Sequence, residues 1–106
     1  MSVPGAGERI RREVTSWPGV EAKPHQFHAV EYDIAKRQLG HVHGDSMLDA
    51  PFPRAIHDAL IAEGRAAVHR FAPDSGWVTL DIETEADVAN AIALLRMNYE
   101  RATKSS

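Results

Sequence analysis

Two histidines stand two residues apart in a glycine-containing stretch, Leu39-Gly40-His41-Val42-His43-Gly44-Asp45. On a β-strand such residues point to the same face, with Cα atoms roughly 6 to 7 Å apart. His41 and His43 could therefore bind one metal ion together, because neutral imidazoles are ligands for zinc, iron, nickel and copper. We expect the flanking glycines to leave room for a ligand or another backbone.

Residues elsewhere in the chain could complete such a site. Asp45 or Asp49 could add a carboxylate oxygen, and His69 could add a third imidazole if its strand lies close by. Trp77 is expected to point toward the open face of its strand, where a ring beside histidines could hold a ligand. Adding the hydroxyl of Ser75, the candidate ligand-binding residues are His41, His43, Asp45, His69, Ser75 and Trp77, and the candidate metal ligands are the three histidines.

The same residues also have ordinary interpretations. Histidine pairs occur on sheet faces without a metal, hydrogen-bonded for example to Asp45 or Asp49. Trp77 could equally cover a sheet edge, and Asp74-Ser75-Gly76 is typical of a plain turn. The other histidines are predicted to have no chemical role. His57 is expected on a helix at the border of the hydrophobic core, and His25 and His28 are expected in solvent.

Several kinds of catalytic site are not indicated by the sequence. The helical H-E-x-x-H of zinc proteases, the G-x-S-x-G of esterases and the glycine-rich phosphate loops are all absent. The sequence identifies no cofactor and does not decide whether the protein is an enzyme.

Alternating and helical patterns predict the elements that position these residues. Apolar spacing of three and four predicts helices at about 8–17, 53–62 and 84–102. Alternation and turn signals predict strands at 20–23, 27–34, 39–43, 66–71 and 77–82, with 39–43 carrying Leu39, His41 and His43 on one side. This order favours an α+β fold: a single antiparallel sheet of four to five strands with three helices packed mainly on one face. The other face is then free for function.

Length and composition support one small domain. The chain has 106 residues, 43% of them hydrophobic, and no cysteine. We expect a flexible segment at 1–7, a single domain at 8–103, and fraying from 103 onward. The net charge of −3 argues against duplex DNA as a partner. No apolar run is long enough for a membrane helix, and the start lacks a signal-peptide pattern, so we expect a cytoplasmic protein.

A series of short motifs resembles one family. They are Trp17-Pro18-Gly19-Val20-Glu21, Leu39 to Asp45, Leu48-Asp49-Ala50-Pro51-Phe52-Pro53, Asp74-Ser75-Gly76-Trp77-Val78, and Leu95 to Tyr99. The family is the short bacterial proteins labelled "luciferase domain", and the resemblance covers about 17–101. It implies no particular chemistry, since nothing here looks like a flavin site. The element order is also similar to the double-wing fold, a likeness of fold that does not carry function.

Two functional hypotheses follow. The first is a small-molecule or metal-binding domain that uses the open sheet face around His41, His43, His69 and Trp77. The second is a protein-interaction or nucleic-acid-binding module of the double-wing type. The sequence indicates neither a specific partner nor an oligomeric state.

Overall fold

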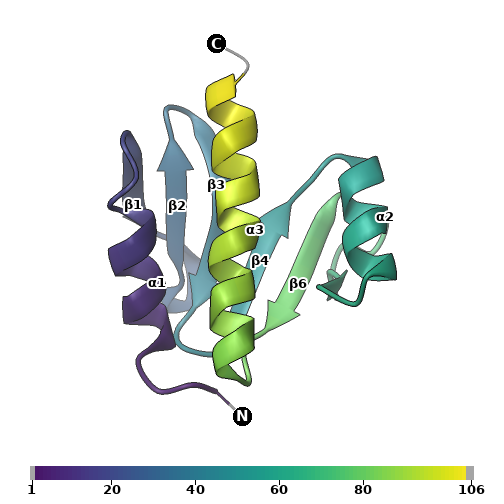
Figure 1. The fold of residues 1–106 in the computed structure, drawn as a ribbon, viewed down its shortest axis with the longest axis horizontal. Helices are drawn as coiled ribbons and strands as arrows, with labels where there is room; N and C mark the ends of the chain where they lie inside the picture. The colour runs from purple at the N-terminus through teal and green to yellow at the C-terminus, as the bar shows by residue number, and fades with distance from the viewer. Residues whose placement is uncertain (1, 105–106) are drawn as a thin grey trace.

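A computed structural model describes residues 2–104 of the chain, and Figure 1 shows their arrangement. The elements follow in the order α1 (Ala6–Val14), β1 (Val20–Pro24), a 3-10 turn η1 (Gln26–His28), β2 (Val30–Ile34), β3 (Arg37–His43), β4 (Met47–Pro51), α2 (Arg54–Ala62), β5 (Ala67–Val68), β6 (Trp77–Asp81) and α3 (Glu85–Lys104). Within these residues no helix combines the length and the apolar character needed to cross a membrane.

The described strands form one antiparallel sheet of six strands in the order β1-β2-β3-β4-β6-β5. The α+β class and the single antiparallel sheet are confirmed, and the strand count is slightly higher than predicted. The unpredicted strand is β4, because Asp and Pro are both uncommon in strands. It forms nevertheless, since Leu48 and Ala50 alternate with Asp49 and enter the core, while Pro51 stands at its end.

The core lies between the sheet and its helices. In Figure 1, α3 crosses in front of β3 and β4, with α1 beside it and α2 near the β6 side of the sheet. Most apolar positions predicted from periodicity are buried, including Tyr32, Val78, Leu80, Ile82 and Leu95, whereas Val30, Ile34 and Ile92 are partly buried and pack against this core. One face of the sheet is thereby covered, and the opposite face carries polar side chains.

A register irregularity changes the predicted faces of β3. Tyr32 pairs with Gly40 but Asp33 pairs with Gln38, so Leu39 is skipped. Leu39 therefore turns into the core, where it is 1% exposed, instead of sharing a face with the histidines as the strict alternation predicted. A Cβ atom on Gly40 would lie 2.8 Å from the Asp49 carbonyl oxygen and 3.0 Å from Leu95 Cδ2. This glycine thus serves the close approach of β4 and α3, and the expected room for a ligand is not its role.

Several predicted boundaries also need correction. Helix α1 begins at Ala6 rather than at Glu8, and β5 is much shorter than the predicted strand at 66–71. The strand predicted to begin at Phe27 begins at Val30, because Phe27 adopts a left-handed conformation in the turn η1. Helix α3 continues to Lys104, and the end of the segment predicted to fray, 105–106, lies outside the described residues.

Candidate functional site

A row of directly paired residues crosses the open face of the sheet. His41 on β3 pairs with Asp49 on β4, and Asp49 pairs with Thr79 on β6. Because paired residues in neighbouring strands point to the same face, an imidazole, a carboxylate and a hydroxyl come together there. His43 lies two residues beyond His41 on the same face.

The Asp49 carboxylate is the centre of this cluster. Its Oδ2 lies 3.0 Å from His43 Nε2, 3.2 Å from His41 Nε2 and 3.7 Å from His69 Nε2. Its Oδ1 accepts a hydrogen bond from the Thr79 hydroxyl at 2.6 Å. The Asp49 residue is only 4% exposed, so three histidines from two parts of the chain converge on a buried anion.

Opposing effects act on the pKa of Asp49. Burial by itself would raise this pKa, since it disfavours the charged carboxylate. Hydrogen bonds from His41, Thr79 and His43 and the charge of His69 outweigh burial and hold the pKa well below its ordinary value. Asp49 is therefore ionised throughout the neutral pH range and available as an oxygen ligand.

The orientation of His41 is set by a second contact. Its Nδ1 lies 2.8 Å from Gln38 Oε1, and an amide oxygen can only accept a hydrogen bond. With Gln38 Oε1 facing the ring, His41 Nδ1 donates to it, and Nε2 is the ring nitrogen that faces the Asp49 oxygen. A proton on Nε2 makes this 3.2 Å contact a hydrogen bond in the metal-free protein, and a metal ion bound to both atoms would replace that proton.

Further rings surround the histidine pair. The His25 ring stacks on His41 at a centroid distance of 4.1 Å, and its Nδ1 lies 2.9 Å from Glu31 Oε1. This hydrogen bond from His25 lowers the pKa of Glu31. The centroid of the Trp77 ring lies 5.3 Å from that of His41 and 6.3 Å from that of His69. The prediction that His25 lies free in solvent is wrong, whereas His28 is exposed as predicted.

A cavity of about 440 Å³ opens over this cluster. Its polar lining includes His41, His43, Asp49, His69 and Thr79. The remaining lining comes mainly from the turn at 25–27 and from 67–71, which comprises β5 and the start of the loop after it. The site therefore has a polar floor on the sheet and walls made by loops.

The structure places the predicted site residues in two groups. His41, His43, His69 and Trp77 lie together on the open face, but Asp45 and Ser75 do not. Asp45 accepts hydrogen bonds from the backbone N–H groups of Gly5 and Gly7, at 3.2 and 2.8 Å, at the start of α1. Ser75 donates to the Ala72 carbonyl and accepts from the Trp77 N–H, as a turn residue does. Neither side chain is placed to bind a ligand held by the histidines.

Sequence reasoning gave Asp49 only as an alternative to Asp45, and it missed Thr79 and His25 in the site. The signal for Asp49 is present, because Leu48 and Ala50 alternate around it and Gly44-Asp45 is a plausible hairpin turn. Thr79 carries no such signal, since its role depends on β6 lying beside β4. His57, predicted to border the core, is 2% exposed on α2.

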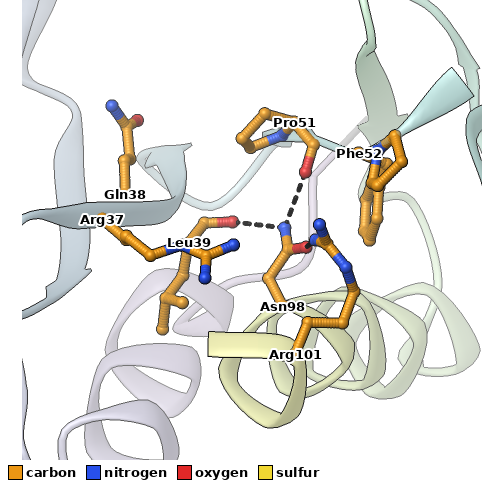
Figure 2. Close-up of a pocket in the computed structure, with 8 residues that line it drawn as sticks. Arg37, Gln38, Leu39, Pro51, Phe52, Asn98 and Arg101 are labelled. Atoms are coloured by element: carbon orange, nitrogen blue, oxygen red, sulfur yellow. Dashed lines mark hydrogen bonds between the residues drawn. The ribbon is translucent and has the colours of Figure 1, made fainter. Parts of the chain in front are cut away.

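A second hollow of about 340 Å³ lies on another part of the molecule, where α3 meets the start of β3 and the end of β4 (Figure 2). Asn98 is 4% exposed there, and its Nδ2 donates to the carbonyls of Leu39 and Pro51 at 3.0 and 2.9 Å. Arg101 donates to Asn98 Oδ1 at 2.6 Å. These contacts join the helix to two strands, so we assign the buried amide a structural role.

Comparison with known proteins yields one match. A family model described as "Luciferase domain" matches residues 36–98, more than half of the chain. The matched segment includes His41, His43, Asp49, His69 and Thr79, but not His25. No curated protein and no solved structure matches the chain.

Proposed function

We propose that the chain, which belongs to the Luciferase domain family, binds a divalent transition-metal ion through His41, His43 and Asp49. One potential ligand atom from each of these residues lies within 4.8 Å of the other two. Two imidazoles and one carboxylate are a ligand set suited to zinc or ferrous iron.

The convergence of His41 Nε2 and His43 Nε2 on Asp49 Oδ2 carries this proposal. The contact between Gln38 Oε1 and His41 Nδ1 orients the His41 ring with Nε2 toward the carboxylate. The separations of 3.2 Å and 3.0 Å between Asp49 Oδ2 and the two Nε2 atoms are a few tenths of an ångström shorter than the spacing of ligands around a zinc ion. Ligands about 2.0 to 2.2 Å from a tetrahedral zinc lie about 3.3 to 3.6 Å from one another, so small side-chain shifts would let these atoms share an ion.

The surroundings support the same interpretation. Gln38 and Thr79 hold His41 and Asp49 by hydrogen bonds, as outer groups commonly hold metal ligands. Three protein ligands leave coordination positions open, and these would face the cavity. His69, 3.7 Å from the Asp49 oxygen, is the nearest candidate for a fourth ligand.

Calorimetric titration with Zn²⁺ at pH 7.5 tests the proposal. The parent protein should bind one ion. Removing a group that only holds a metal ligand lowers metal affinity roughly 10- to 100-fold, and the His41→Ala/His43→Ala double variant should lose more Zn²⁺ affinity than that. His28→Ala is the matched control, because His28 is exposed and does not line this cavity. A His69→Ala variant reports whether a fourth protein ligand takes part.

Equal affinity in the parent and the double variant would overturn the metal site. Circular dichroism of the metal-free proteins must show that each variant is folded. Among the described residues, no contact or charge pattern favours a protein or nucleic-acid partner over a small ligand.

A further inference from the structure

Large exposed hydrophobic side chains gather at one place among the described residues. Phe27 is 86% exposed, Phe71 is 83% exposed and Val68 is 47% exposed. All three line the cavity over the histidine cluster. Exposed apolar side chains that border a single polar site commonly mark a ligand-binding surface.

The two phenylalanines come from connections toward opposite edges of the sheet. Phe27 belongs to the connection between β1 and β2, and Phe71 to the connection between β5 and β6. In the sheet order, β3 and β4, which carry the histidine pair and Asp49, lie between these two connections. The cavity thus has a polar floor with an apolar residue on each flank.

Phe27 holds its position against the conformational preference of its backbone. Phe27 has φ 59° and ψ 37°, and His28 follows with φ 65°. Residues with a Cβ atom rarely occupy this left-handed region, and two in succession are rarer still. The neighbouring His25 ties this turn to the site through its stacking on His41. Glycine would suit this backbone better, but it would remove the phenyl ring from the rim.

We infer that the cavity binds a small organic molecule with an oxygen-donor head group and an aromatic or similarly apolar body. This inference rests on the proposed metal site, whose open positions would take the oxygen donor. The body then lies between Phe27 and Phe71. The cavity volume of about 440 Å³ suits a molecule of this size. A metal ion with open coordination positions favours an anionic oxygen donor such as a carboxylate or hydroxamate.

Two probes with the same head group separate the parts of this inference. Benzohydroxamate and acetohydroxamate are titrated into the Zn²⁺-loaded protein and followed by calorimetry, with the zinc content of the protein measured afterwards. We expect benzohydroxamate to bind at least about tenfold more tightly, since the phenyl group buries against the two phenylalanines. Phe27→Gly and Phe71→Ala should each remove most of this difference and leave Zn²⁺ and acetohydroxamate affinities unchanged.

His28→Gly is the matched control for Phe27→Gly. Both variants relieve a positive φ, but only Phe27→Gly removes a phenyl ring from the cavity. We expect both to keep or raise the melting temperature and only Phe27→Gly to weaken benzohydroxamate binding. Zn²⁺ binding with equal affinity for both probes would overturn this inference alone. Failure to bind Zn²⁺ would overturn the proposed function, and this inference with it.

Discussion

Asp49 lies directly opposite His41 in the β3–β4 pair, with its Oδ2 3.2 Å from His41 Nε2. The sequence separation between the two residues is that of a hairpin, and the contact depends on the turn that brings β4 back along β3. Asp49 also pairs with Thr79 on its other side, so the carboxylate is held from both neighbouring strands.

Asp49→Asn should destabilise the metal-free protein at neutral pH by about 1 to 3 kcal/mol, because the variant loses charged hydrogen bonds in a buried place. The folded-state pKa of Asp49 is depressed, so its stabilisation is present above the ordinary value and is lost as pH falls through the folded value. The difference between parent and variant should therefore shrink on acidification below about pH 4. Urea unfolding with a chelator at pH 7 and pH 3 measures this difference in stability. A difference that is larger at pH 3 would contradict a depressed pKa for Asp49.

Gly40→Ala should destabilise the protein by about 1 to 3 kcal/mol through overpacking. The new methyl group would meet the Asp49 carbonyl oxygen at 2.8 Å and Leu95 Cδ2 at 3.0 Å, and β4 cannot yield without moving Asp49. Zn²⁺ affinity should fall as well. Gly44→Ala is the control, since that glycine also has a positive φ but nothing within 4 Å of its added Cβ. Thermal melts and Zn²⁺ titrations of both variants provide the comparison.

Leu95→Ala should cost about 2 to 5 kcal/mol, because Leu95 is fully buried where α3 meets the sheet and its truncation leaves a cavity. Ile92→Ala on the same helix should cost less, since Ile92 is only partly buried. Chemical denaturation of the two variants measures the contrast. Equal losses would mean that the sheet side of α3 is wrongly identified.

Tyr32 should become a source of instability at high pH. Burial raises the pKa of Tyr32 to about 12, compared with about 10 in an unfolded chain. Because the folded value is the higher one, the contribution of Tyr32 is fully present below pH 10 and is lost as pH rises toward 12, by up to about 3 kcal/mol. Between pH 9 and pH 12, the free energy of unfolding should fall less steeply with pH for Tyr32→Phe than for the parent, as denaturant unfolding at each pH measures. Identical slopes would show that the hydroxyl is not buried.

Local patterns in the sequence were sufficient to predict much of the fold. Alternation around Tyr32 and Leu80 and the helical spacing of Val88, Ala91 and Leu95 correctly predicted which sides are buried. These predictions succeed because burial of apolar surface imposes the period of each element directly on the chain. The shared face of His41 and His43 follows from the same rule.

The identity of the carboxylate and of the surrounding groups was decided only by tertiary structure. Asp45 is adjacent to the histidine stretch in sequence, yet it binds the start of α1, while Asp49 reaches the histidines because β4 pairs with β3. Strand pairing depends on contacts between distant segments, and local propensity argued against a strand containing Asp49 and Pro51. The bulge that turns Leu39 into the core and the turn that brings His25 onto His41 likewise depend on packing between strands. The sequence by itself determined which residue types could bind a metal ion, and the register of the sheet determined which of them meet.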